Sequence, residues 1–195
     1  KEKYDLVFPL AVKALNAPHK TENNLVKLNI QNKTSLNKSL SAMFSHSDSV
    51  LVEEMVLNSL VELSIAVTRD NTGIFLLTIA SGGIFTELSN QRVNLILPAT
   101  DKDIEEALSK LAISKILSGF RGSPPADKRT IVEAIQAISR YTLANLTLVS
   151  EIEINPLIVG ETYAVAADIL LTHILKESGN ENREPNQNKD KRKNT

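Results

Sequence analysis

The sequence contains no cysteine, so disulfides, thiol catalysis and thiolate metal sites are all excluded. It carries little net charge, because 22 Lys and Arg residues nearly balance 23 Asp and Glu residues and give a formal charge of -1. This balance argues against a nucleic-acid or membrane partner, since both favour a strongly positive surface. No apolar run approaches the roughly 20 residues that a membrane-spanning helix needs, and no signal-type segment follows residues 1–5. We therefore expect a soluble, cytoplasmic protein without redox chemistry.

The length of 195 residues, of which 42% are hydrophobic, is sufficient for one domain or for two small lobes. A boundary lies near Lys176, because residues 177–195 include no large apolar side chain that would offset the entropy of ordering. We expect residues 1–175 to form the folded domain and residues 176–195 to be a disordered polar tail. The sequence has no internal repeat.

Short strand-like and helix-like segments alternate before this boundary. The strand-like segments are 6–15, 25–30, 50–56, 61–68, 74–80, 151–159 and 163–171. Residues 35–44 have helical spacing, and Thr100 with Asp103 forms a capping-box pattern that starts a second helix. A third helix follows Pro124-Pro125, with one apolar stripe of Ile131, Ile135, Ile138 and Leu143. This order predicts an α+β fold with mixed sheets and helices packed against them.

The last predicted hairpin has one face made of oxygen-bearing side chains: Glu151, Glu153 and Asn155. Pro156 is expected to end the regular pairing of this strand. If the turn has an even number of residues centred on Gly160-Glu161, Glu153 lies opposite Asp168. Two carboxylates about 5 Å apart repel each other, and a hard divalent cation such as Mg²⁺ relieves the repulsion. The alternative is a solvent-facing strand that happens to be acidic.

Residues 151–159, EIEINPLIV in one-letter code, resemble a strand near the end of the ATP-grasp domain in the ADP-forming acyl-CoA synthetases, or acetate–CoA ligases, and in the succinyl-CoA synthetase β subunit. Four further segments resemble this family in the same order: VLVEEMV at 50–56, ELSIAVTRD at 62–70, SGGIFTE at 81–87 and GFRGSPPAD at 119–127. The resemblance covers roughly residues 6–172, and five motifs in register are much more specific than one. It implies an ATP-grasp fold, in which two small α+β lobes flank a nucleotide cleft, with the N-terminal part of the domain incomplete.

The resemblance assigns ATP or ADP binding to residues in both expected lobes. It implies that Lys13 contacts the nucleotide phosphates and that Glu53 and Glu62 accept hydrogen bonds from the adenine amino group or the ribose hydroxyls. Gly82 and Gly83 would let the backbone approach the cleft closely. Without the resemblance, Lys13 reads as an edge or surface lysine, the two glutamates as surface charge, and the glycines as a plain turn.

The family also implies a metal site and a phosphoryl carrier. Glu153, Asn155 and Asp168 resemble its Mg²⁺ ligands, in agreement with the hairpin argument. His19 resembles the histidine that relays a phosphoryl group between the nucleotide and a histidine of the partner domain, a role that suits imidazole near pH 7. The alternative for His19 is an exposed loop histidine.

The chain departs from the family at three places. Asn23 and Asn24 replace two glycines of a phosphate-binding loop, and 169–171 lacks an expected arginine. We also expect the helix and strand that normally precede the Lys13 strand to be missing.

Three functions remain open at this point. The first is the nucleotide-binding part of an ADP-forming acid–CoA ligase, as a subunit or fragment, which interconverts acyl-CoA, ADP and phosphate with acid, CoA and ATP through phosphohistidine. It would need a CoA-binding, α-type subunit or domain, possibly in a hetero-oligomer. The second is a regulatory, nucleotide-sensing ATP-grasp domain, and the third is a degenerate, non-catalytic one.

Overall fold

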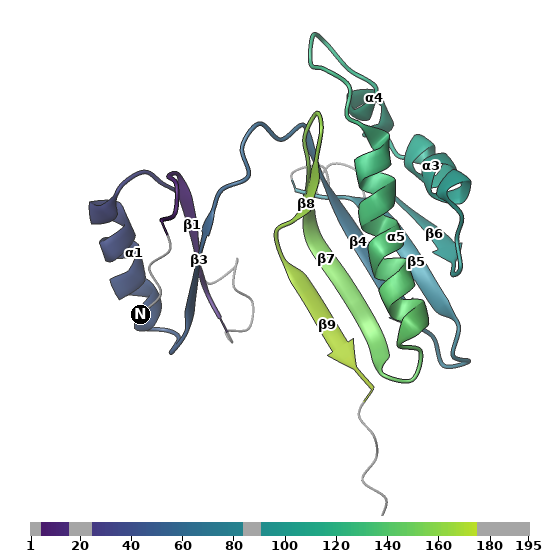
Figure 1. The fold of residues 1–195 in the computed structure, drawn as a ribbon, viewed down its shortest axis with the longest axis horizontal. Coiled ribbons are helices and arrows are strands. Elements are labelled where there is room, and N and C mark those ends of the chain that lie inside the picture. Colours follow the sequence, from purple (N-terminus) through teal and green to yellow (C-terminus); the bar gives the residue numbers. More distant parts are fainter. Residues whose placement is uncertain (1–4, 16–24, 84–90, 175–195) are drawn as a thin grey trace, which may run out of the picture.

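The computed structural model describes residues 5–15, 25–83 and 91–174, and Figure 1 shows that they form two α+β lobes joined by one connecting segment. The small lobe contains β1 (Leu10–Ala14), β2 (Val26–Ile30), α1 (Lys33–Phe44) and β3 (Val50–Glu54). The large lobe contains β4 (Val61–Arg69), β5 (Phe75–Ser81), β6 (Arg92–Ile96), α3 (Asp101–Lys110), α4 (Ser114–Leu117), α5 (Lys128–Ala144), β7 (Val149–Val159), β8 (Ala164–Ala166) and β9 (Ile169–His173). The predicted α+β class is therefore confirmed.

The small lobe is a three-stranded antiparallel sheet in the order β2-β1-β3, with α1 on one face. Because side chains alternate along a strand, Leu10, Val12 and Ala14 of β1 point together into a small core that includes Met43 of α1. The opposite face of β1 carries Ala11 and Lys13. The position of α1 thus decides which face of the sheet remains open.

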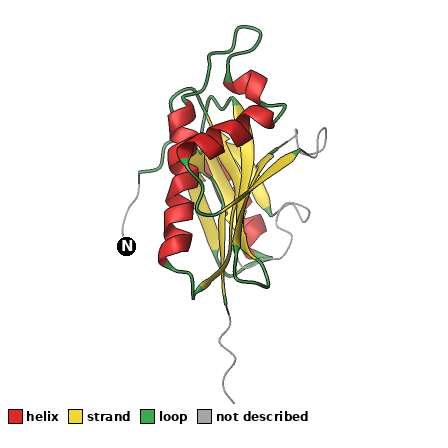
Figure 2. Ribbon diagram, turned by 90° about the vertical axis from the view of Figure 1, so that its right-hand side faces the viewer, coloured by secondary structure: helices red, strands yellow, loops and turns green. Residues whose placement is uncertain are grey.

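The large lobe is a six-stranded sheet in which β6, β5, β4, β7 and β8 follow one another and β9 also pairs with β7. Figure 2 shows the helices lying along one side of this sheet. The inward residues of β4, which include Leu63 and Ile65, are fully buried in the same core as Ile131 and Ile135 of α5. Burial of this apolar surface stabilises the lobe, at roughly 25 cal/mol for each Å².

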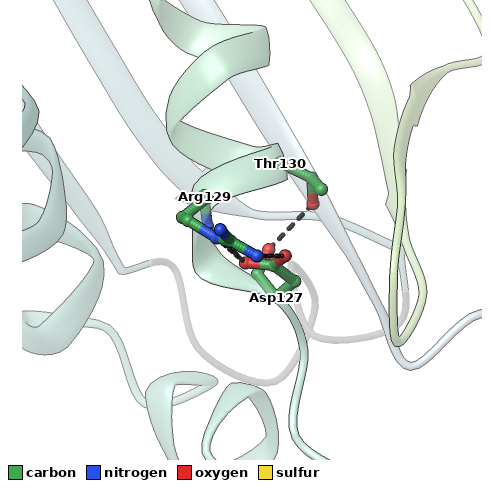
Figure 3. Close-up of polar contacts among 3 residues, drawn as sticks. All are labelled: Asp127, Arg129 and Thr130. Carbon is green, nitrogen blue, oxygen red and sulfur yellow. Dashed lines mark hydrogen bonds and ion pairs between the residues drawn. The ribbon is translucent and has the colours of Figure 1, made fainter.

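Both predicted helix starts in this lobe are present. Thr100 caps α3 in a capping box with Asp103, whose Oδ2 accepts a 2.8 Å hydrogen bond from the Thr100 amide. Asp127 caps α5. Figure 3 shows the Arg129 guanidinium, which donates two hydrogen bonds to the Asp127 carboxylate. The Thr130 hydroxyl donates to the Asp127 carbonyl at 2.8 Å. The side-chain hydrogen bond from Arg129, followed by that of the Arg129 amide, lowers the pKa of Asp127 below its ordinary value.

Several sequence predictions are wrong in detail. Leu143 is 36% exposed and lies off the buried stripe of α5, because that stripe continues to Ser139 and Thr142 instead. Strand β6 was not predicted, since its residues alternate between exposed and half-buried positions at the sheet edge. The predicted strand 163–171 is two strands, β8 and β9, of which β9 presents exposed Ile169, Leu170 and Leu171.

Pro156 does not end the pairing of β7, which continues to Val159. Ile65 pairs with Ile154 and Leu63 pairs with Leu157, so β7 carries one extra residue over this stretch. Such a bulge accommodates a proline within a paired strand. It also shifts the alternation, which places Ile154 and Leu157 on the same buried side.

No helix in the described ranges is long and apolar enough to span a membrane. The predicted tail, 176–195, lies outside the described residues.

Candidate functional site

A cleft of about 590 Å³ lies between the open face of the small-lobe sheet and the large lobe. It is lined by residues of β1, β2, β3, the connecting segment 55–60, β4 and the β7–β8 region. Six of the residues singled out in the sequence line it: Lys13, Glu53, Glu62, Gly83, Asn155 and Asp168. Gly82 and Glu153 lie beside it without lining it, and His19 falls outside the described residues. Residues that are far apart in the sequence, such as Lys13 and Asp168, therefore line the same cleft.

Lys13 is a partly buried cation at the centre of this arrangement. Its side chain is only 12% exposed, and its strand β1 is the central strand of the small sheet, so it is not an edge or surface lysine. The Lys13 ammonium forms an ion pair with Glu53 of β3, which lies on the same face of the small-lobe sheet as Lys13. It also donates a 2.8 Å hydrogen bond to the Ala167 carbonyl of the large lobe. A buried charge needs such partners to offset its lost hydration. Lys13 therefore connects the two walls of the cleft.

Glu62 and the glycine pair form a second local unit. The Gly82 amide donates a 2.8 Å hydrogen bond to the Glu62 carbonyl, and a Cβ on Gly82 would lie 3.0 Å from the backbone of Glu62 and Leu63. Gly83 has a φ of +56°, and its Cβ would lie 2.6 Å from Oε2 of Glu62. A side chain at Gly82 would crowd the β4 backbone, and one at Gly83 would be strained by the positive φ and would have to displace the Glu62 carboxylate. The turn is thus tied to the backbone of Glu62 and packs closely against its side chain.

The predicted pairing of Glu153 with Asp168 is wrong, because the turn at the hairpin contains four residues, Gly160–Tyr163, and is centred further along the chain than predicted. Glu153 instead pairs with Leu170, whereas the carbonyl of Asp168 accepts a 3.1 Å hydrogen bond from the Asn155 amide. The three predicted metal ligands nevertheless remain neighbours, since Nδ2 of Asn155 donates to Oε1 of Glu153 at 3.3 Å. Asn155 and Pro156, which lie within the β7 bulge, both line the cleft.

The charged residues that line the described part of the cleft are mostly acidic. Lys13 is accompanied by four carboxylates, which belong to Glu53, Glu54, Glu62 and Asp168. No group of three or more His, Cys, Asp or Glu side chains in the described residues is arranged to hold a metal ion by itself. A polyanion entering this cleft would therefore need added positive charge, and a divalent cation shared between protein and ligand oxygens supplies it.

The apolar part of the cleft was missed in the sequence. Ile158 of β7 pairs with both Glu62 and Val165, and all three line the cleft on the side of the sheet away from the core. Met55 and Val56 of the connecting segment add further apolar surface. The sequence does contain a signal for this apolar surface. Residues 157–159 are apolar on both faces of their strand, which indicates that both faces are covered. The cleft thus combines an apolar portion with a charged portion.

Comparison with known proteins points to one family. The profile of the ATP-grasp domain matches residues 3–172. The chain is 26% identical over 165 residues to the acetate–CoA ligase [ADP-forming] II subunit beta of Pyrococcus furiosus, which covers 80% of this chain and 70% of that subunit. It is 25% identical over 152 residues to the 4-hydroxybutyrate–CoA ligase [ADP-forming] of Nitrosopumilus maritimus, covering 73% of this chain and 22% of that enzyme.

The fold also matches a solved structure. The acetyl-coenzyme A synthetase 1 of Ca. Korarchaeum cryptofilum, in complex with coenzyme A and Mg-AMPPCP, superposes with a TM-score of 0.73 and 25% identity. The match covers 86% of this chain and 77% of that one. The chain therefore spans most of the Pyrococcus subunit but only about a fifth of the longer Nitrosopumilus ligase.

Proposed function

Because the chain belongs to the ATP-grasp domain family, we propose that it is the nucleotide-binding part of an ADP-forming acyl-CoA synthetase. The observation that carries this proposal is the meeting of Lys13, Glu62 and Asp168, from three distant segments, in one cleft. The relatives support the same reaction class, since they are ADP-forming acid–CoA ligases or their beta subunits. The reaction converts acyl-CoA, ADP and phosphate into acid, CoA and ATP.

The two portions of the cleft suit the two ends of ATP or ADP. The apolar surface of Val56, Ile158 and Val165 suits the flat adenine ring, and Glu53 and Glu62 accept hydrogen bonds from its amino group or from the ribose. Lys13 provides the charge for the phosphates, and its third N–H group, beyond those directed at Glu53 and Ala167, donates to a phosphate oxygen. Phosphoryl transfer depends mainly on such positioning and charge stabilisation.

The residues present fit a bound Mg²⁺. Asn155 and Asp168 offer the amide and carboxylate oxygens that this ion takes, Glu153 lies beside them, and nucleotide phosphates and water complete a typical Mg²⁺ shell. When bound, the ion would neutralise developing charge on the phosphates. The excess of carboxylates in the cleft supports this assignment.

The complete reaction needs a partner. The CoA-binding and acyl-binding functions are assigned to an α-type subunit or domain, in a hetero-oligomer, as the designation of relatives as beta subunits suggests. His19 would carry the phosphoryl group between the two. We also propose a cytoplasmic location, which the lack of cysteine fits.

The phosphoryl-carrier role can be tested by incubating the chain with Mg²⁺ and ATP labelled in the γ-phosphate. Attack by the neutral His19 imidazole would break the bond between the γ-phosphorus and the bridging oxygen, form a P–N bond and release ADP. We expect an acid-labile, base-stable label that is lost in His19→Ala and retained in His46→Ala, a change at an exposed histidine outside the cleft. Binding of MgATP without any label would contradict the catalytic role and favour the nucleotide-sensing one.

A further inference from the structure

The segment between the lobes, residues 55–60, is anchored to the small lobe by hydrogen bonds of Met55. The Met55 amide donates a 3.0 Å hydrogen bond to the Pro9 carbonyl at the start of β1. The Met55 sulfur in turn accepts from the Asn29 amide of β2 at 2.9 Å. Met55 therefore moves with the small lobe, although it lies outside the strands of that lobe.

The same segment is anchored to the large lobe by hydrogen bonds at Leu57 and Leu60. The Leu60 amide donates a 2.7 Å hydrogen bond to the Val159 carbonyl, directly before β4 begins. Further back, the Leu57 carbonyl accepts a hydrogen bond from the Tyr163 hydroxyl. Leu57 is thus attached to the large lobe three residues before Leu60. Only Val56 lies between the last small-lobe anchor and the first large-lobe anchor.

Tyr163 is itself held on a well-supported turn. The turn is closed by a 2.9 Å hydrogen bond from the Gly160 amide to the Tyr163 carbonyl, and it is tied to the start of α5 by one of 2.8 Å from the Asp127 amide to the Glu161 carbonyl. The Tyr163 ring lies so close over Gly160 that a Cβ at Gly160 would overlap the ring. The position of the Tyr163 hydroxyl is therefore set by β7, β8 and α5 together.

The backbone between the two large-lobe anchors adopts an unusual conformation. Asn58 has a φ of +59°, in the left-handed region that residues other than glycine seldom occupy, although asparagine tolerates it better than most. A sparsely populated conformation persists where neighbouring contacts over-determine it, and here those contacts are at Leu57 and Leu60.

We propose that Tyr163 is a positioning residue: by holding the Leu57 carbonyl, it confines the pivot between the lobes to Val56 and thereby sets their relative orientation. Without this hydrogen bond the unfastened stretch would extend from Val56 through Ser59. The consequence for ligands rests on the proposed function, because the nucleotide-binding groups lie on both lobes and meet only at a suitable orientation. The pivot itself follows from the contacts alone.

The absence of cysteine makes the lobe orientation directly measurable, since two introduced cysteines would be the only labelling sites. Lys38→Cys on α1 and Ser109→Cys on α3 are exposed positions in different lobes that do not line the cleft. Spin labels at these sites report the distance between the lobes by pulsed electron paramagnetic resonance. We expect Tyr163→Phe and Gly160→Ala each to broaden the distance distribution of the nucleotide-free protein.

The matched control is Tyr141→Phe, which removes a hydroxyl from an exposed tyrosine of α5. It should leave the distribution unchanged, and the melting temperature should differ little between the two tyrosine variants. A purely structural role for Tyr163 would lower the melting temperature without broadening the distribution, and an unchanged distribution in Tyr163→Phe would overturn the proposal.

The same variants separate this inference from the proposed function. Loss of one hydrogen bond that preorganises the cleft should weaken nucleotide binding by about 3- to 10-fold in Tyr163→Phe. Equal affinity in the parent and in Tyr163→Phe would contradict the positioning role. If the parent binds no nucleotide, the proposed function fails, while the distance measurement still decides whether Tyr163 fixes the pivot.

Discussion

Lys13 of the small lobe donates a 2.8 Å hydrogen bond to the Ala167 carbonyl of the large lobe, across the cleft that separates them. The same ammonium is paired with Glu53, so its charge is compensated before any ligand enters. The ammonium has three N–H donors, so a nucleotide phosphate can accept from the third one while both protein partners stay in place. The residue therefore links phosphate recognition to the contact between the lobes.

Lys13→Met should weaken nucleotide binding about 10- to 100-fold, which corresponds to the roughly 1.5–3 kcal/mol of a hydrogen bond to a charged group. Isothermal titration calorimetry with MgADP measures this effect. Lys27→Met is the matched control, because Lys27 is an exposed lysine on the neighbouring strand β2 that does not line the cleft. Equal losses in both variants would show that general charge, rather than the Lys13 position, determines affinity.

Gly83→Ala should weaken nucleotide binding by displacing the Glu62 carboxylate, because the new Cβ would lie 2.6 Å from its Oε2. The left-handed backbone adds a cost of about 1–2 kcal/mol to the free energy of folding. Gly122→Ala also places a side chain on a positive-φ backbone, at a φ of +89°, but its Cβ would meet nothing within 4 Å. Both variants should lose stability in thermal melts, and only Gly83→Ala should lose affinity; the same affinity in both would exclude the role of Glu62.

Much of this site was predictable from residue types and motifs, and the remainder depended on geometry that the sequence does not signal. The family motifs singled out Lys13 and Glu62, and both residues line the cleft. The facing partner of Glu153 was wrong because register depends on where the turn is centred, and a centre one residue further along shifts the pairing by two without changing the face. The hydroxyl of Tyr163 reaches Leu57 only through tertiary packing, over 106 positions in the sequence.

The cap of α5 gives a prediction for the dependence of stability on pH. The Arg129 side chain lowers the pKa of Asp127 below its unfolded value of 3.8, so this carboxylate stabilises the folded state above that pH. The contribution is lost as the pH falls through the still lower folded pKa. Asp127→Asn keeps a capping side chain but removes the charge. Its melting temperature should lie below that of the parent at pH 7 and approach it near pH 2, and a constant difference over this range would contradict the assignment.

Binding of an adenine nucleotide together with Mg²⁺ in the cleft is the property on which the proposed function depends. The most direct test is calorimetric titration of MgADP and MgATP into the parent, Asp168→Ala and Asp48→Ala, the last of which removes an exposed carboxylate outside the cleft. We expect micromolar binding by the parent and by Asp48→Ala, and much weaker binding by Asp168→Ala or after chelation of the metal. Absence of binding by the folded parent at millimolar nucleotide would contradict it.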